Sequence, residues 1–434
     1  MEGNVPVRST GLLWLCALAS GVGALLFMQM QPLVGRVLLP QLGGTPGVWV
    51  TCLAFFQLVL FVGYLWAHAL TRRLELRAQL LVQGLLLIAV VVHGPLALPP
   101  TPAETLTASP TWMLLGFLLQ HVAPTAVVLA TTSPVLQAWY AAAGGSEPYA
   151  LYAISNVGSI LGLLSYPLLV EPYLGLAAQR LPWVALFVIY ALLMLAAAGA
   201  TWRAAATRSA DRHPTRANTH EPPIAARDAL LWFALSAAPS ALLAAVSNHI
   251  TTDVPAVPLL WVAPLTLYLG SFVVTFSRGR ELAAQLHAGL WIACTVALPI
   301  LLLPGNEARL GVLLAVPLLT LWSGAVSCHG RLAALRPAPS RLTAYYACLA
   351  AGGAAGGGFV AFVAPAIFSD HFELVLAMLA IHGLQLVLSR RRDRKAAPSG
   401  AQRLAWLGFG LALPVLLATL TVQVAGLGRS GHLL

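Results

Sequence analysis

Charged residues are scarce in this sequence. Only 9% of its 434 residues are Asp, Glu, Lys or Arg, whereas 59% are hydrophobic. Soluble globular chains carry about 25% charged residues, and a soluble protein this apolar could not cover its surface. Lipid, by contrast, accepts apolar side chains on every outward face of a helix bundle. The composition therefore excludes a soluble domain and predicts an all-α, polytopic membrane protein whose main partner is the lipid bilayer.

Motifs for catalysis, metal binding and nucleotide binding are also missing. The five cysteines lie in or beside apolar runs and form no CxxC pair, and the chain contains no HExxH, Walker or Ser-His-Asp arrangement. The glycine-rich run at 352–358 falls inside an apolar segment, where it cannot serve as a nucleotide-binding turn. We therefore expect no catalytic residues, no cofactor, no metal site and no enzyme activity.

What the chain does contain is a series of apolar segments of about twenty residues, the length that a helix needs to cross the hydrocarbon core. Thirteen such segments are predicted. They lie near 12–30, 47–70, 78–98, 112–140, 150–170, 181–202, 229–248, 256–277, 283–304, 310–328, 342–367, 372–389 and 404–426.

The basic residues predict the orientation, because short loops rich in Lys and Arg stay in the cytoplasm. With the N-terminus inside, all of the 24 Lys and Arg residues fall on the cytoplasmic side except Arg36, Arg180, Arg309 and Arg429. The net charge of +10 is then explained by topology, and no nucleic-acid partner is expected. The expected location is the cell (inner) membrane.

The chain also repeats itself. A polar, proline-containing stretch at 203–228 reads as a cytoplasmic linker between a six-helix half at 1–202 and a second six-helix half at 229–389, with a basic loop and an extra span at 390–434. Residues of the first half recur in order in the second. The matches are Ala17-Leu18 with Ala234-Leu235, Pro46-x-x-Trp49-Val50 with Pro258-x-x-Trp261-Val262, and Ser133, Tyr152, Gly158 and Gly162 with Ser327, Tyr346, Gly352 and Gly356.

Two like-oriented six-helix halves are the parallel-repeat plan of the major facilitator transporters, which bind substrate between the halves. The predicted fold is therefore two parallel six-helix repeats plus one C-terminal transmembrane helix. Gly158, Gly162, Gly352 and Gly356 form small-xxx-small patterns, which let helix backbones approach closely. We expect tight helix packing at these four residues, with a gating surface as the alternative.

Several segments resemble the membrane part of fused facilitator/spermidine-synthase-like proteins. They are Gln31-Pro32-Leu33-Val34-Gly35-Arg36 with Leu39-Pro40, Thr131-Thr132-Ser133-Pro134, Ser155-Asn156-x-Gly158-Ser159, Thr251-Thr252-Asp253 and Cys328-His329-Gly330. In the fused proteins a soluble aminopropyltransferase-like domain follows, whereas this sequence ends at Leu434 after an apolar segment. The resemblance implies a membrane protein without the synthase domain.

Polar and ionisable groups inside predicted spans are costly and mark a pathway or an internal pair. Asn248, His249 and Asp253 gather at the outer end of the seventh span, and His121 lies in the fourth. A carboxylate beside an imidazole can exchange a proton near neutral pH. His249, Asp253, Asn156, His121 and Asn248 are therefore candidates for substrate contact or proton coupling, with backbone hydrogen bonding at an interfacial loop as the alternative.

Arg36 and Glu171 both fall near the predicted outer face of the first half. They are expected to form a structural ion pair rather than a substrate clamp.

Three functions follow from these features. The first is a secondary transporter that moves a small polar or cationic metabolite by alternating access. The second, implied by the resemblance, is a non-transporting subunit that docks a separate aminopropyltransferase-like or methyltransferase-like enzyme on its cytoplasmic face. The third, an intramembrane enzyme using His249 and Asp253, has no accompanying nucleophile or metal set.

Overall fold

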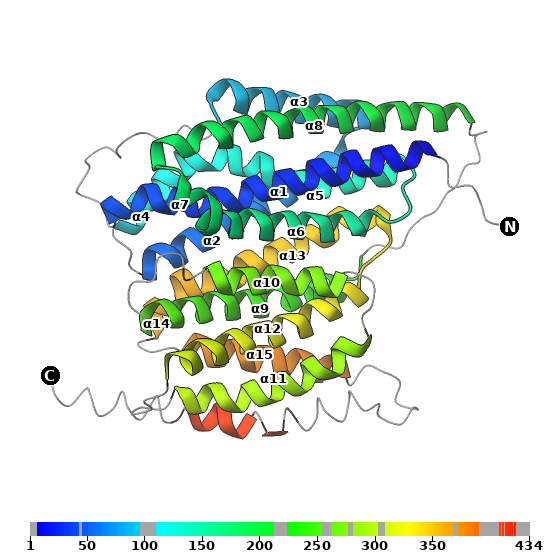
Figure 1. Cartoon of the computed structure of the whole chain (residues 1–434). Helices are drawn as coiled ribbons and strands as arrows, with labels where there is room; N and C mark the ends of the chain where they lie inside the picture. The colour runs from blue at the N-terminus through cyan, green and yellow to red at the C-terminus, as the bar shows by residue number, and fades with distance from the viewer. Residues whose placement is uncertain are drawn as a thin grey trace, which may run out of the picture. The chain divides into compact units, whose positions relative to one another are not determined.

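The chain folds into helices throughout the part that its computed structural model describes (Figure 1). The described residues are 7–42, 46–95, 110–211, 224–253, 260, 262–276, 281–302, 309–368 and 372–389, with 408, 410–411, 413–419 and 421 near the C-terminus. No strand occurs among them. Ten of the helices are long and apolar enough to cross a membrane, and Val262–Phe276 and Gly289–Leu301 are shorter apolar helices.

These helices correspond in order to the first twelve predicted spans. The thirteenth, predicted at 404–426, lies mostly outside the described residues, although 413–419 are helical. One boundary was wrong: the first span was expected to end at residue 30, but the helix runs from Val7 to Leu42 and passes through Pro32 and Pro40. Proline is tolerated in membrane helices because neighbouring helices and polar side chains satisfy the freed backbone groups.

The helices form two compact units, each of which contains a short segment from the other half of the sequence. The first unit comprises Met1–Gly43, Phe55–Leu230 and Arg336–Ala350. In it, α1 packs against α5, α6 and α8, and α3 packs along α8 (Figure 1). Its elements are α1 (Val7–Leu42), most of α2 (Pro46–Arg73), α3 (Leu76–His93), α4 (Pro110–Phe117), η1 (Leu118–Val122), α5 (Ala123–Ala142), α6 (Pro148–Ser165), η2 (Tyr166–Val170), α7 (Glu171–Tyr173), α8 (Leu176–Asp211), η3 (Pro339–Arg341) and the first half of α13 (Leu342–Gly358).

The second unit comprises Gly44–Ala54, Leu231–Leu335 and Ala351–Leu434. Here α12 packs against α10, α11 and α15. Its elements are most of α9 (Ala226–Asp253), α10 (Val262–Phe276), α11 (Glu281–Leu301), α12 (Leu310–Ala334), the second half of α13, η4 (Phe359–Val363), α14 (Ala364–Ile367) and α15 (Phe372–Ser389). The division into sequence halves at 203–228 stays a prediction.

The repeated glycines make equivalent contacts in the two units. A Cβ atom on Gly158 would meet the carbonyl oxygen of Gly21, and one on Gly162 would meet that of Leu25, so α6 lies directly against the α1 backbone. In the second unit, Gly352 and Gly356 of α13 face the carbonyl oxygens of Phe233 and Ala237 in α9 in the same way. Only a residue without a side chain permits this approach.

These contacts also correct the repeat alignment. Gly21 and Phe233 occupy equivalent positions, and their separation in sequence equals that between Pro46 and Pro258. The proposed match of Ala17-Leu18 with Ala234-Leu235 has a different separation and was wrong. The mistaken match arose because Ala and Leu are frequent in this chain, so that chance identities are common.

Each repeat also contains a π-helical turn after its glycine pair. In the first unit, η2 (Tyr166–Val170) follows α6, and in the second, η4 (Phe359–Val363) follows α13. A proline lies at or just after each turn, at Pro167 and Pro365. Proline removes a backbone donor, and the wider π-helical turn accommodates the disrupted hydrogen-bond ladder. The repeat therefore extends to backbone geometry that hydropathy alone does not reveal.

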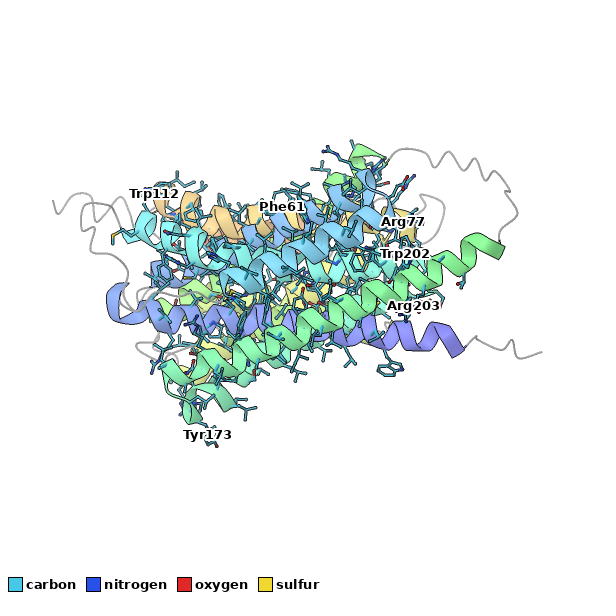
Figure 2. The ribbon with its side chains drawn as sticks, turned by 90° about the horizontal axis from the view of Figure 1, so that it is seen from above. Phe61, Arg77, Trp112, Tyr173, Trp202 and Arg203 are labelled. Carbon is cyan, nitrogen blue, oxygen red and sulfur yellow. The ribbon has the colours of Figure 1, made fainter. Side chains whose placement is uncertain are left out.

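The two ends of the first unit differ in chemistry. Figure 2 shows Arg77, Trp202 and Arg203 gathered where α3 begins and α8 nears its end, and the Arg77 guanidinium carbon lies 4.6 Å from the centroid of the Trp202 ring. Trp112 and Tyr173 lie at the opposite end and are 71% and 78% exposed (Figure 2). Exposed aromatic rings are typical of the membrane–water interface, so the unit has a basic end and an aromatic end.

Candidate functional site

The polar residues predicted at the outer end of the seventh span lie at the C-terminal end of α9. His249 is buried, with 4% of its surface exposed, and Asn248 is half-buried. Asp253 is the last residue of α9, but its side chain lies outside the described part of the structure. Whether a carboxylate faces the His249 imidazole therefore stays a prediction.

Asn156 and His121 occupy more ordinary surroundings. The Asn156 side chain is buried and its Nδ2 donates a hydrogen bond of 2.8 Å to the carbonyl oxygen of Tyr152, one turn earlier in α6. His121 lies half-buried in the π-helical turn η1, with its ring centroid 5.0 Å from that of Phe117. One Asn156 donor is thus used within its own helix.

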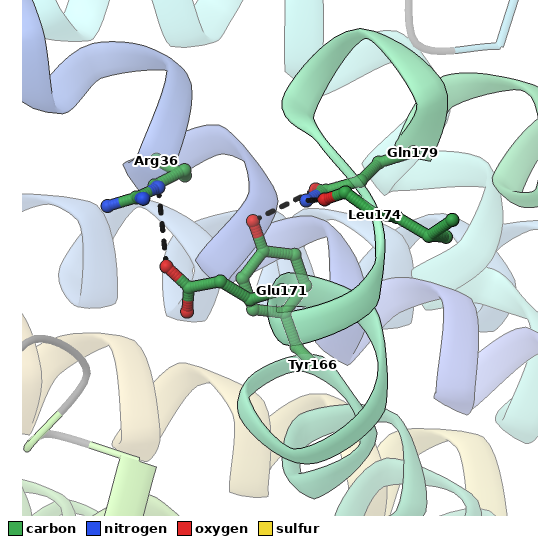
Figure 3. A network of polar contacts seen from close by, with 5 residues as sticks. All are labelled: Arg36, Tyr166, Glu171, Leu174 and Gln179. Atoms are coloured by element: carbon green, nitrogen blue, oxygen red, sulfur yellow. Dashed lines mark hydrogen bonds and ion pairs between the residues drawn. The ribbon is translucent and has the colours of Figure 1, made fainter.

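Arg36 and Glu171 form an ion pair at the aromatic end of the first unit (Figure 3). The Arg36 Nε lies 3.3 Å from Glu171 Oε1, and the two side chains are 44% and 23% exposed. Beside them, the Tyr166 hydroxyl donates to Gln179 Oε1 at 3.0 Å, and Gln179 Nε2 donates to the Leu174 carbonyl at 2.8 Å. Partly exposed ion pairs contribute roughly 0–1 kcal/mol, so this network orients α7 against α1 rather than dominating stability.

A cluster of tyrosines, not predicted from the sequence, forms the most elaborate polar site in the described part of the first unit. This tyrosine cluster consists of Tyr64 from α2, Tyr149 and Tyr152 from α6, and Tyr345 and Tyr346 from α13. Tyr345 and Tyr346 have no exposed surface, and the other three are under 10% exposed. The Tyr346 ring lies at its centre, 4.7 Å from Tyr152, 5.4 Å from Tyr345 and 6.1 Å from Tyr64, measured between ring centroids.

Hydrogen bonds tie the tyrosine cluster to residues distant in sequence. The Tyr346 hydroxyl donates to Gln137 Oε1 in α5 at 3.0 Å, and Gln137 Nε2 donates to Ser133 Oγ at 2.9 Å. The Tyr149 hydroxyl donates to the Pro337 carbonyl oxygen at 2.7 Å. The start of α13 and the segment before it are therefore attached to α5 and α6 by directional bonds as well as by ring contacts.

The edge of the tyrosine cluster carries an imidazole and a guanidinium group. His68 Nδ1 in α2 lies 3.0 Å from Thr343 Oγ1, and Thr71 Oγ1 lies 3.4 Å from the same oxygen. The Arg336 guanidinium carbon lies 5.3 Å from the Tyr149 ring centroid, within the range of a cation–π contact. The cluster thus joins α2, α5 and α6, which precede the linker, to residues 336–346, which follow it.

The groups of the tyrosine cluster form hydrogen bonds and ring contacts. Neutral hydroxyls, amides and aromatic faces hold segments together, and such contacts can be exchanged for contacts with water or a polar ligand. Among the described residues no group of three or more His, Cys, Asp or Glu is placed to hold a metal ion.

Sequence reasoning missed this cluster for a physical reason. Tyrosines in apolar helices look like ordinary core residues, and their convergence depends on which helices become neighbours. The one signal available was the pairing of Tyr152 with Tyr346 in the repeat, since in the structure these two equivalent residues are in ring contact.

Comparison with known proteins supports the fold. No protein-family model and no curated protein sequence matches the chain. Among solved structures, a POT family transporter in complex with 5-aminolevulinic acid matches 87% of this chain and 95% of its own at 12% identity, with a TM-score of 0.52. The human organic anion transporter MFSD10 matches 93% and 99%, respectively, at 15% identity, with a TM-score of 0.50.

At these identities the likeness is one of fold. The chain is a multi-pass membrane protein, helical throughout its described residues, with a major-facilitator-like fold. The comparisons do not support a fusion with a synthase-like domain or a docked soluble enzyme.

Proposed function

We propose that the chain is a secondary transporter that moves a small polar or cationic metabolite by alternating access. The observation that carries the proposal is the paired glycine contact. Gly158 and Gly162 hold α6 against α1, and Gly352 and Gly356 hold α13 against α9, so both repeats use the same helix pairing. Two like-oriented repeats in a fold shared with transporters are the architecture in which one repeat rocks against the other.

The tyrosine cluster supports a gating step in that cycle. It lies where α2 and α5 end and where α6 and α13 begin, which places it toward a single end of the helices. That end is the basic one, near Arg72, Arg73 and Arg77, and the distribution of basic residues favours the cytoplasm for it. In our proposal the tyrosine cluster closes the cytoplasmic end, and the protein resides in the inner membrane with its N-terminus inside.

The chemistry of the described residues favours a polar or cationic substrate over an apolar one. Tyrosine rings bind cations through their faces, and Arg336 over Tyr149 shows that one ring of the cluster already accepts a cation. Opening of the cluster would expose hydroxyl, amide and imidazole groups of Tyr346, Gln137 and His68 to the pathway. These groups exchange hydrogen bonds with a polar solute at little net cost.

Flux through proteoliposomes tests the proposal. We expect the purified chain to give saturable uptake or counterflow of at least one compound from a panel of radiolabelled polyamines, amino acids and small organic anions, with and without a proton gradient. A variant that carries Gly352→Val should give no flux, because it cannot seat α13 on α9. Folded wild-type protein that moves none of the panel above the empty-liposome rate would contradict the proposal.

A further inference from the structure

A histidine buried in the second unit has one ring nitrogen that no described residue contacts by a hydrogen bond. His329 lies in α12 and has no exposed surface. Its ring is stacked on Phe272 of α10, with centroids 3.6 Å apart and an interplanar angle of 17°, and the Tyr268 ring meets it edge-on at 5.0 Å. Nδ1 lies 2.7 Å from Ser271 Oγ, whereas Nε2 is buried and has no hydrogen-bond partner among the described residues.

The hydrogen bonds of Ser271 determine which nitrogen carries the proton. The Ser271 hydroxyl donates its only hydrogen to the Tyr268 carbonyl oxygen at 2.5 Å. Its oxygen must therefore accept from His329, so that Nδ1 carries the N–H and Nε2 is the bare nitrogen with a free lone pair. A buried acceptor left without a donor is unfavourable, because it has lost its hydrogen bonds to water and gained none in the protein.

The repeat shows that this position does not require an imidazole for packing. At the separation that pairs Ser133 with Ser327, His329 corresponds to Val135. At the separation that pairs Pro46 with Pro258, Ser271 corresponds to Val59. Both valines are buried in the first unit. An apolar pair is therefore sufficient for the fold, and the polar pair in the second unit needs another explanation.

A second buried histidine in the same unit shows the difference between a structural and a functional imidazole. His382 Nε2 lies 3.0 Å from Thr295 Oγ1, whose hydroxyl donates to the Trp291 carbonyl, so Nδ1 of His382 is the bare nitrogen. The unpaired Trp291 Nε1 donor belongs to a ring only 5.0 Å away, between centroids. A donor and an acceptor on neighbouring rings can be bridged by one water. The two rings that contact His329, those of Phe272 and Tyr268, carry no unpaired donor in the described part of the unit.

We infer that Nε2 of His329 is a proton-acceptor site through which the proposed transport is coupled to protons, an inference that rests on the proposed function. When the site becomes wet, Nε2 takes a proton from hydronium, which leaves water, and the ring becomes an imidazolium that keeps its Nδ1–H bond to Ser271. The Phe272 face stabilises this cation. Because the group is fully buried, a proton reaches it along transient water more readily than a metabolite does.

No carboxylate is hydrogen-bonded to either nitrogen of His329 in the described part of the second unit. The titratable or charged side chains on the elements around it are Tyr268 of α10, Cys328 and Arg331 of α12, Arg227, Asp228, His249 and Asp253 of α9, Glu281, His287 and Cys294 of α11, and Glu373 and His382 of α15. Of these, Tyr268 is in ring contact with it. The proton must therefore be exchanged with water rather than with a neighbouring acid.

Charge movement after a pH step tests the inference without knowledge of the substrate. Proteoliposomes on a solid-supported membrane are stepped between neutral and acidic buffer, and the transient current is recorded for the wild type and for a Ser271→Val, His329→Val double variant that copies the first unit. A His329→Gln variant provides a second probe, because its amide can donate to Ser271 but cannot take up a proton. His382→Leu, in the same unit, is the matched control.

We expect the wild type and His382→Leu to give a transient current, and both His329 variants to fall to the level of empty liposomes. An unchanged current in folded His329→Gln, or no current from the wild type, would overturn the inference. Its failure is distinguishable from failure of the transport proposal, because a wild type that moves a panel compound while His329→Gln keeps the full current overturns the inference and leaves transport intact.

Discussion

Replacing Gly158 with valine is expected to prevent normal assembly of the first repeat. A Cβ atom at this position would meet the carbonyl oxygen of Gly21 and lie 2.9 Å from its Cα atom, and both are backbone atoms of α1 that cannot rotate away. Overpacking of this kind costs about 1–3 kcal/mol, occasionally more. The folded yield in detergent, measured by fluorescence-detected size exclusion, should therefore fall about tenfold or more, since 1.4 kcal/mol is a factor of ten.

Gly199→Val in α8 is the matched control, because no atom outside its own helix lies within 4 Å of a Cβ atom there. Both variants place the same β-branched residue in a helix, so the intrinsic helix-propensity cost cancels. Gly356→Val should behave like Gly158→Val, since its Cβ would meet the Ala237 carbonyl in α9. Equal yields for Gly158→Val and Gly199→Val would show that the contact between α1 and α6 does not hold the repeat together.

Tyr346→Phe is expected to loosen the tyrosine cluster without disturbing its rings. The substitution removes the hydroxyl that donates to Gln137 Oε1 and leaves a buried acceptor unpaired, at a cost of about 1–3 kcal/mol. If the cluster closes the gate, the open state gains population by about tenfold. Cys348, half-buried two residues further along α13, should then react about tenfold faster with N-ethylmaleimide, as measured by peptide mass spectrometry.

The control for this prediction is Tyr190→Phe. Tyr190 in α8 has no exposed surface, and its hydroxyl lies 2.6 Å from Thr132 Oγ1, away from the tyrosine cluster. Tyr190→Phe loses a buried hydrogen bond just as Tyr346→Phe does, so any general destabilisation of the protein is shared by the two variants. If Tyr190→Phe accelerates labelling of Cys348 as much as Tyr346→Phe does, the cluster has no special gating role.

Features set by hydrophobicity were predictable from the sequence. Apolar length located twelve of the helices in order, and the spacing of Gly158 and Gly162 anticipated a close helix contact whose partner, α1, only the structure identifies. The end of α1 was not predictable in the same way. Pro32 suggests a helix end in a single-sequence reading, but neighbouring helices in a membrane protein compensate for the lost backbone hydrogen bond.

Features set by which helices become neighbours could not be predicted. Nothing in the sequence of α12 marks His329 as part of a polar pair. Its partner Ser271 comes from α10, more than fifty positions away. Tyr346 similarly finds Gln137 only once α13 lies against α5. The sequence instead indicates His249 and Asp253 as candidates, because these two residues are only four positions apart. Residues that are close along the chain can be grouped from the sequence, whereas residues that are close only in space can be identified once the fold is known.

Reporter fusions test most directly whether two like-oriented six-helix repeats build the proposed transporter. Truncations after Leu74, after Gly94 and after Asp211 are fused to green fluorescent protein and to alkaline phosphatase, which is active only outside the cytoplasm. We predict fluorescence after Leu74 and Asp211 and phosphatase activity after Gly94. Leu74 and Asp211 on opposite sides of the membrane would contradict the parallel repeat and the alternating-access mechanism that depends on it.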